Sequence, residues 1–295
     1  MSYKRIIILV ALAALCLSLF TSCKNPLPTN EVTETPTTKD PHEGMVQAYL
    51  SDGSTAWIRY YENVEKNDLL PTCFAEKEGF IEYSDPRYTA TTGIDVSEFQ
   101  NEIDWEAVAA DGIDFAIIRV GYRGWGQSGT IREDSEFKHN LKAAKAAGLD
   151  VGVYFYSQAV NSAEAVAEAD FVLNLIRDYE LSLPVFFDWE EVENNPDART
   201  ANIDKSILSE LSLAFCRTIE QAGYRAGVYY YQDLAYNYYN LELLDDFVIW
   251  HSEPNSVPRF YYAFDMWQYT YSGKVSGIEG KVDLNLKFDR VSADG

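Results

Sequence analysis

Four acidic side chains occupy positions in or at the end of apolar runs, where a carboxylate is costly to bury without a role. Asp95 and Asp283 each lie inside such a run, and Asp188 and Glu190 end a third run. Side chains alternate along a strand, so Asp188 and Glu190 project to the same side, with backbones about 6–7 Å apart. Paired carboxylates at this spacing can act as an acid and its partner. We expect these four acids to form a catalytic site.

Aromatic residues accompany the acids. Two carboxylates beside flat aromatic side chains are typical of the active sites of glycoside hydrolases. In these enzymes one acid protonates the leaving oxygen and the second stabilises or attacks the anomeric centre. The residues at strand ends that we expect to bind a sugar are Tyr154, Tyr156, Trp250, Trp267 and Gln268. The run Tyr229 to Tyr231 is placed similarly. Alternation allows only about half of each run to face the site.

The elements that must position these residues begin at Gly93, where short apolar runs start to alternate with helical spacing, as in βα units. Eight strands are predicted, and the segments are Ile94 to Ser97, Phe115 to Val120, Val151 to Tyr156, Val185 to Trp189, Ala226 to Tyr230, Val248 to His251, Phe264 to Gln268 and Val282 to Leu284. Clear helices follow the first four strands and a shorter helical stretch follows the fifth, whereas irregular segments join the last three. This order predicts a closed α/β barrel with its site at the C-terminal ends of the strands.

Capping residues mark the helices between the early strands. Asp104 can cap a helix that ends at Gly112, and Asn161 with Glu164 has the pattern of a capping box. Two further helices are predicted to end at Gly148 and Gly223.

The segment before the barrel is predicted to serve export. Lys4 and Arg5 precede an apolar run that is shorter than the ~20 residues of a membrane span, so residues 1–22 are interpreted as a signal peptide, with an uncleaved membrane anchor as the alternative. The run ends in a sequence that resembles a bacterial lipobox, with Cys23 as the residue that would be lipidated. Residues 23–44 are predicted to be a disordered linker, and residues 45–92 a small extension of strands or hairpins packed on the barrel.

Charge and composition exclude several classes. The chain has 24 basic and 46 acidic residues, a formal net charge of −22, so nucleic acid is not an expected partner. The three histidines have no metal-ligand spacing, and we expect neither a metal nor a cofactor. Cys73 and Cys216 are the remaining thiols, and whether they pair stays open.

Several segments in order resemble glycoside hydrolase family 25. They are Gly93 to Ser97 with Ile103 to Trp105, Phe115 to Arg119, Pro184 to Glu190, Met266 to Tyr269, and Gly277 to Asn285. That family comprises lysozymes, or N-acetylmuramidases, which cut the β-1,4 bond between N-acetylmuramic acid and N-acetylglucosamine in peptidoglycan. The resemblance implies a catalytic barrel over residues 93–290, of an irregular TIM-like kind with (β/α)5 followed by three β-strands.

Carried over by motif, Glu190 matches the family's general acid/base and Asp188 its partner, while Asp95 and Asp283 complete the site. The resemblance leaves open whether Asp188 attacks, orients the substrate acetamido group or assists a water. The chain departs from the family at His251 and Ser252, which follow Trp250. We expect a monomeric, exported enzyme that is lipid-anchored at Cys23 on the outer face of the bacterial membrane or cell surface and acts on peptidoglycan glycan strands. The alternative is a catalytically silent, glycan-binding surface lipoprotein on the same barrel.

Overall fold

The computed structural model describes residues 40–192 and 194–291, and residues from His42 onward form one compact unit. The predicted signal peptide, Cys23 and nearly all of the predicted linker lie outside the described residues. Within the described part of the chain, no helix is both long and apolar enough to cross a membrane.

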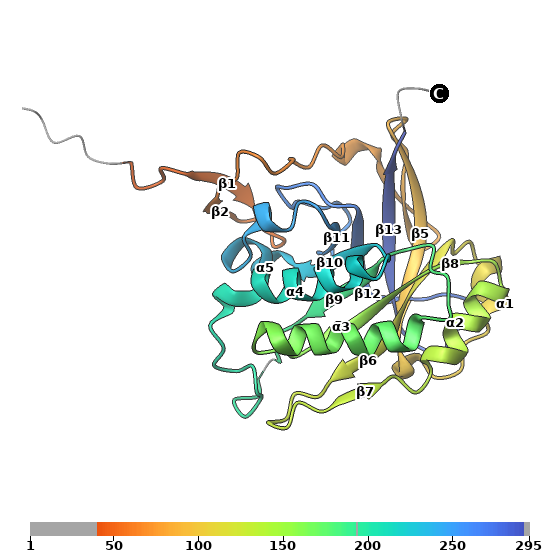
Figure 1. The fold of residues 1–295 in the computed structure, drawn as a ribbon. Coiled ribbons are helices and arrows are strands. Elements are labelled where there is room, and N and C mark those ends of the chain that lie inside the picture. The colour runs from red at the N-terminus through yellow and green to blue at the C-terminus, as the bar shows by residue number, and fades with distance from the viewer. Residues whose placement is uncertain (1–39, 193, 292–295) are drawn as a thin grey trace, which may run out of the picture. The chain divides into compact units, whose positions relative to one another are not determined.

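Eight strands form a closed barrel in the order β5-β13-β12-β11-β10-β9-β8-β6, and β6 pairs back onto β5 (Figure 1). They are β5 (Tyr88–Val96), β6 (Phe115–Arg123), β8 (Asp150–Ser157), β9 (Val185–Trp189), β10 (Ala226–Tyr231), β11 (Val248–Ser252), β12 (Met266–Gly273) and β13 (Val282–Arg290). Each overlaps one of the eight predicted strands. The apolar runs between turn signals therefore located the barrel strands correctly.

The barrel is mixed and has few helices, so the predicted (β/α)5 TIM-like arrangement is wrong. Strand β13 runs antiparallel to both β12 and β5, because only residues 274–281 connect it to β12 and so short a link cannot make a parallel crossover. The helices are α1 (Trp105–Ala110), α2 (Phe137–Ala146), α3 (Ser162–Ile176), α4 (Leu208–Gln221) and α5 (Gln232–Asn237). Two of these, α1 and α5, have only six residues, and an additional strand, β7 (Ile131–Glu133), separates β6 from α2.

Side-chain caps start α1 and α3 where the sequence predicts. Asp104 Oδ1 accepts a hydrogen bond from the Ala107 amide, and the Asn161 side chain accepts one from the Glu164 amide. The predicted capping box is only half formed. The Glu164 carboxylate accepts from the Val160 amide instead of the Asn161 amide and pairs with Arg199, since a cation lies within its reach.

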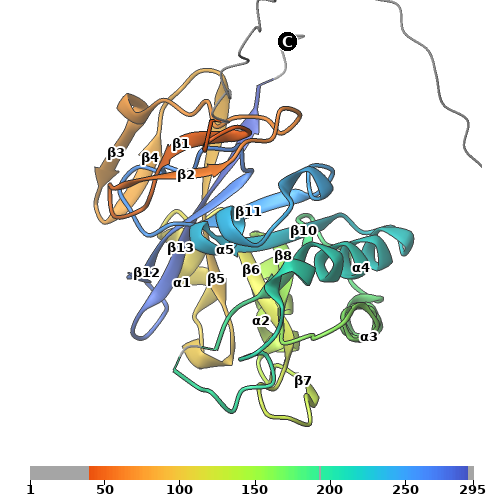
Figure 2. The same ribbon diagram turned by 90° about the vertical axis from the view of Figure 1, so that its left-hand side faces the viewer.

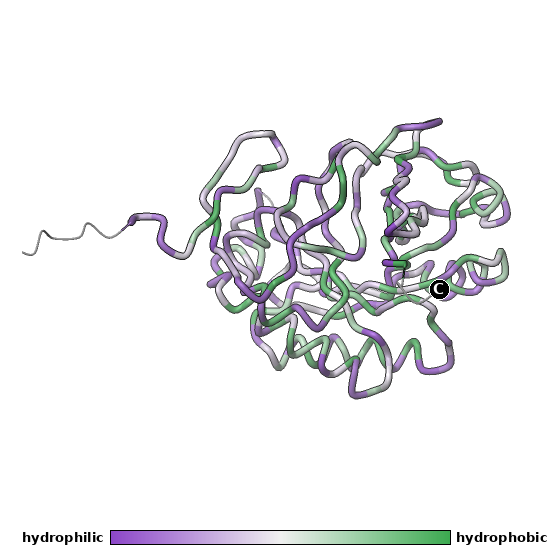
Figure 3. Tube along the Cα trace, turned by 90° about the horizontal axis from the view of Figure 1, so that it is seen from above, coloured by the Kyte–Doolittle hydropathy of each residue, from purple (hydrophilic) through white to green (hydrophobic). Residues whose placement is uncertain are grey.

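Alternation along the strands divides the core into two layers. Residues that point into the barrel form its floor, and they are Phe115, Ile117, Phe186, Tyr229, Trp250 and Met266. Gly93 and Gly227 make room for this floor, because a Cβ at either position would lie within 2.5 Å of the ring of Phe115 or Phe186. Residues that point outward pack against the helices, whose colours in Figure 3 alternate along their length as expected for amphipathic elements.

Two hairpins precede the barrel. They are β1 (Met45–Tyr49) with β2 (Thr55–Arg59), and β3 (Phe74–Lys77) with β4 (Phe80–Tyr83). Figure 2 shows both on the side of the barrel away from α3 and α4. The second hairpin packs through Phe74, whose ring meets that of Trp267 edge-on at 5.5 Å between centroids. Three short 3-10 helices lie within or next to the barrel at Glu98–Gln100, Lys205–Ile207 and Leu241–Leu243, and a fourth, Pro71–Cys73, precedes β3.

Candidate active site

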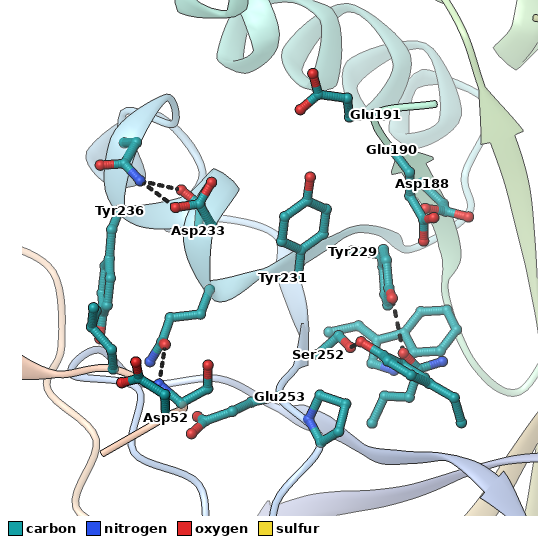
Figure 4. Close-up of a pocket in the computed structure, with 18 of the residues that line it drawn as sticks. Asp52, Asp188, Glu190, Glu191, Tyr229, Tyr231, Asp233, Tyr236, Ser252 and Glu253 are labelled. Carbon is teal, nitrogen blue, oxygen red and sulfur yellow. Dashed lines mark hydrogen bonds between the residues drawn. The ribbon is translucent and has the colours of Figure 1, made fainter. Parts of the chain in front are cut away.

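A cavity of about 1050 Å³ opens at the C-terminal ends of the parallel strands (Figure 4). Of the predicted site residues, those that line it are Asp95, Tyr154, Tyr156, Asp188, Glu190, Trp250, Gln268 and Asp283. They come from six different strands or strand ends, which the barrel closure brings together. The four acids predicted from separate apolar runs therefore share one cavity.

Asp95 and Asp283 form one side of the acid cluster. They are register partners on antiparallel β5 and β13, and Gln268 Nε2 donates to Asp95 Oδ2 at 2.8 Å and to Asp283 Oδ2 at 3.3 Å. Asn285 Nδ2 donates to the same oxygen of Asp95 at 2.8 Å. Two amides thus hold this pair of carboxyl groups in place.

Burial raises the pKa of both carboxyl groups, and their different neighbours separate the two values. Burial raises the pKa of Asp95 to about 6, although the hydrogen bonds from Asn285 and Gln268 act to lower it. The pKa of Asp283 rises to about 8, first through burial and then through the charges of Asp95 and Glu190. Near neutral pH the two carboxyl groups therefore share about one proton as a pair.

Asp188 is a buried acid of the site. It is 5% exposed, and its Oδ1 accepts no hydrogen bond from any described residue. Burial, followed by the charges of Glu190 and Asp95, raises the pKa of Asp188 well above its usual value, while the charge of Arg119 acts in the opposite direction. A buried carboxyl oxygen without a donor, in a cavity of this size, is placed to meet a ligand.

Glu190 follows the last residue of β9 and is only half-buried. Its main-chain carbonyl accepts a hydrogen bond of 2.7 Å from Gln158 Nε2, and Thr200 Oγ1 donates to Gln158 Oε1 at 2.7 Å. The preceding residue, Trp189, points away from the cavity and donates its indole N–H to the Ala159 carbonyl. The main chain is therefore fixed on both sides of the Glu190 side chain, which reaches the cavity.

The aromatic residues divide into a floor and a rim. Trp250 is 1% exposed, with Tyr229, Phe186 and Tyr154 around it at centroid distances of 4.8–6.0 Å, and its indole N–H donates to Asn285 Oδ1. Tyr156 is more exposed and lines the cavity above this floor. Trp250 therefore orients Asn285, which donates to Asp95, and exposes little surface on which a sugar could stack.

Trp267 was expected to bind a sugar at the site, but it does not line the cavity. It is fully buried on the outer side of β12, where it contacts Phe74 and donates its indole N–H to the Glu253 carbonyl. Its neighbour Gln268 points inward. Strand alternation permits only one of the two to face the site, and Trp267 is a packing residue.

His251 and Ser252, where the chain departs from the family pattern, also point to opposite sides of their strand. His251 is buried outside the barrel lumen, stacked on Phe260 at 4.2 Å, with its Nε2 3.4 Å from Glu253 Oε2. Ser252 points into the cavity and its Oγ lies 2.7 Å from the Tyr271 hydroxyl. Of these two residues, only Ser252 is placed to touch a sugar.

Several residues of the site do not follow from the sequence analysis. The sequence does contain a pattern that could have identified Asn285. It is a polar residue in an apolar strand, and it shares the face of Asp283 two residues earlier. Arg119 also stands in an apolar strand; it is 7% exposed, donates to Asp134 and Glu98, and its charge acts on Asp188. Gln158 gives no signal, because its partners come from distant loops.

The described residues contain no cluster of metal-ligating side chains. No group of three or more His, Cys, Asp or Glu side chains in this part of the chain is arranged to hold an ion. Cys73 and Cys216 are both free thiols and do not form a disulfide.

Comparison with known proteins gives a consistent result. Lysozyme M1 of Streptomyces globisporus is 25% identical over 213 residues, which are 68% of either chain, and the autolytic lysozyme of Clostridium acetobutylicum is 28% identical over 198 residues, 65% of this chain and 54% of the relative. Among solved structures, the modular autolysin LytC of Streptococcus pneumoniae, in complex with a synthetic peptidoglycan ligand, matches with a TM-score of 0.59 and 27% identity over 84% of this chain and 57% of LytC.

A family 25 glycosyl hydrolase from Bacillus anthracis matches with a TM-score of 0.55 and 25% identity, covering 70% of this chain and 91% of the other. The chain spans only about half the length of the clostridial relative and of LytC. The model described as glycosyl hydrolases family 25 matches residues 94–278, which contain Asp95, Asp188 and Glu190. This chain belongs to glycosyl hydrolase family 25.

Proposed function

We propose that this protein is a peptidoglycan hydrolase of the lysozyme type, an N-acetylmuramidase that cleaves the β-1,4 bond between N-acetylmuramic acid and N-acetylglucosamine. The observation that carries the proposal is the meeting of Asp188 and Glu190 with the Asp95–Asp283 pair in one cavity. Membership of family 25 and the named lysozyme relatives support the same activity.

In the proposed mechanism Glu190 is the general acid/base. It is half-buried at the cavity wall, so it can protonate the leaving oxygen and later take a proton from the attacking water. Asp188 lies on the same side of the chain two residues earlier and meets the anomeric centre. Its unpartnered Oδ1 is the acceptor for positive charge or for a substrate N–H there.

The Asp95–Asp283 pair supplies the electrostatic part of the mechanism. An oxocarbenium-like transition state carries positive charge that the neutral sugar lacks, so a cavity rich in carboxylates stabilises the transition state more than the ground state. Burial raises the pKa values of Asp95 and Asp283, which supports a site that disfavours additional negative charge before such a cation develops. The two amides on Asp95 keep its ionised oxygen aimed at that position.

The deciding experiment is digestion of peptidoglycan by the purified protein, followed by mass spectrometry of the new reducing ends. N-acetylmuramic acid ends support the proposed bond, whereas N-acetylglucosamine ends would replace it by glucosaminidase specificity on the same barrel. Absence of product from several wall types, together with measured glycan binding, would favour the catalytically silent alternative.

We further propose that the protein is exported and held at the membrane by lipid on Cys23, after removal of residues 1–22. The support comes from the lipobox-like sequence and from the family's action on cell walls. Residues 23–44 would then serve as a spacer between the membrane and the barrel.

A further inference from the structure

The β1–β2 hairpin forms one wall of the cavity although it lies outside the segment that matches the family. Trp57, Met45, Arg59 and Asp52 all line the cavity, whereas the family match begins at residue 94. Figure 4 shows Asp52 on the opposite side of the pocket from Asp188, with Tyr231 between them. The cavity therefore continues from the acid cluster to the hairpin.

Buried side chains of the barrel hold this hairpin in place. Gln232 Oε1 accepts from the Ser51 amide at 2.6 Å, and Gln232 Nε2 donates to the Tyr49 carbonyl at 3.3 Å. At the other end, the Tyr262 hydroxyl donates to the Arg59 carbonyl at 2.8 Å. Gln232 and Tyr262 are both buried, so the hairpin is a built part of the cavity wall.

Trp57 is the apolar surface that this wall presents to the cavity. Its indole is 48% exposed and is stacked on the His42 ring, with 3.9 Å between centroids and 16° between planes. A large flat ring that is held in orientation yet left half exposed in a hollow is the kind of surface that a ligand covers. Tyr49, on the same hairpin, is 61% exposed but does not line the cavity.

Size and charge indicate the kind of ligand. The cavity, at about 1050 Å³, lies at the upper end of the roughly 300–1,000 Å³ typical of ligand sites, and its lining runs from the acid cluster to the hairpin. Among the described residues that line it, eight are acidic and only Arg59 is basic. This field favours an uncharged N-acetylglucosamine ring at the hairpin over a ring or peptide that carries a carboxylate.

We propose that the β1–β2 hairpin is a remote sugar subsite, in which Trp57 stacks on a pyranose ring of the same glycan strand, beyond the sugars at the cleaved bond. Asp52 and Arg59 would bind the hydroxyl or acetamido groups of that ring. The inference rests on the proposed function for the identity of the strand. Binding energy gained at the hairpin helps to hold long strands across the acids.

The test compares Trp57→Ala with Tyr49→Ala, a matched control on the same hairpin, using peptide-free glycan strands of graded length. For Trp57→Ala, we expect the ratio of kcat/KM on long strands to kcat/KM on the shortest cleaved fragment to fall about tenfold, equivalent to ~1.4 kcal/mol. Trp57→Phe, which keeps a flat ring, should restore part of the ratio, and Tyr49→Ala should keep it. A ratio in Trp57→Ala equal to that of the wild type would overturn the inference, and circular dichroism and Tm identify any variant that has lost its fold.

Two further outcomes separate this inference from the proposed function. Binding of the same strands is measured by calorimetry in the Glu190→Gln background, where Trp57→Ala should weaken binding about tenfold. If the wild type binds strands through Trp57 but cleaves none, the proposed activity fails and the subsite stands. If Trp57→Ala affects only strands that carry stem peptides, the ligand is a peptide and the sugar subsite is rejected.

Discussion

Asp95 and Asp283 are register partners on antiparallel strands, and their carboxyl groups share the Nε2 donor of Gln268. The reversal of β13, which makes the barrel mixed, is what sets these two acids side by side. With pKa values raised to about 6 and about 8, they divide one proton near neutrality. The acid cluster thus carries less negative charge at rest than four separate carboxylates would.

Asn285→Ala should move the acidic limb of the pH profile. The variant removes a 2.8 Å donor from Asp95, and a lost hydrogen bond of about 1–1.5 kcal/mol corresponds to about one pKa unit. The hydrogen bond from Asn285 lowers the pKa of Asp95 because it stabilises the ionised form. Loss of that hydrogen bond therefore raises the pKa, and a smaller fraction of Asp95 is ionised at pH 6. We expect kcat/KM to fall more at pH 5.5 than at pH 8, as measured by wall-clearing assays across this range. A uniform loss at all pH values would contradict this account.

Asp283→Asn should stabilise the fold at alkaline pH. The unfolded chain ionises Asp283 near pH 4, whereas the folded protein keeps the proton to about pH 8. The stability that goes with this raised pKa is full below about pH 4 and is lost as the pH rises towards 8. The variant escapes that loss, so its Tm should exceed the wild-type value by at least about 2–4 °C, the shift expected for each 1 kcal/mol, at pH 8.5 and converge with it near pH 4.

The control for this measurement is Asp289→Asn, at an exposed position of the same strand. It should not reproduce the alkaline gain in Tm. Equal Tm differences for Asp283→Asn at pH 4 and pH 8.5 would show that Asp283 does not retain its proton.

Glu190→Gln should abolish hydrolysis with the fold intact. Loss of general acid/base catalysis costs about 10²–10⁴-fold in rate, and a half-buried side chain at the cavity wall contributes little to stability. Glu191→Gln is the matched comparison, because Glu191 also lines the cavity but is paired with Lys205. We expect a much smaller decrease in kcat for that variant in assays of released reducing ends. Comparable losses for both would remove Glu190 from the proposed role.

Cys23→Ala should release the protein from membranes. A diacylated cysteine partitions into lipid, whereas the described part of the chain has no helix that could cross a membrane. Detergent phase separation of cells that express each form measures the partition. A variant that still partitions wholly with detergent would contradict lipid anchoring at Cys23.

Strand alternation is the rule by which the sequence predicted most of the site. It placed Asp188 with Glu190 on a common face, because the period of two is local. The same rule did not choose between Trp267 and Gln268, since either face of β12 is apolar enough to be buried. Only the contact between Trp267 and Phe74, nearly two hundred residues apart, decides which side is the lumen.

Long-range pairing also explains what the sequence did not predict. The direction of β13 depends on its pairing with β5, and the hairpin wall depends on Ser51 and Gln232, which are 181 positions apart. The register of such contacts leaves no periodic signal in either segment. The apolar runs therefore located the strands, whereas the mixed topology and the extended cavity required the folded arrangement.

Gln158 should act as a positioning residue for Glu190. Its Nε2 donates to the Glu190 carbonyl, and Thr200 holds its other end, so the three form one chain of hydrogen bonds. Gln158→Leu removes the donor, and we expect kcat to fall about tenfold with little change in KM, since Gln158 does not line the cavity. Thr200→Val should give a smaller loss in the same parameter. Because both act through one chain, the double variant should resemble Gln158→Leu alone, and additive losses would show that Thr200 affects catalysis by another route.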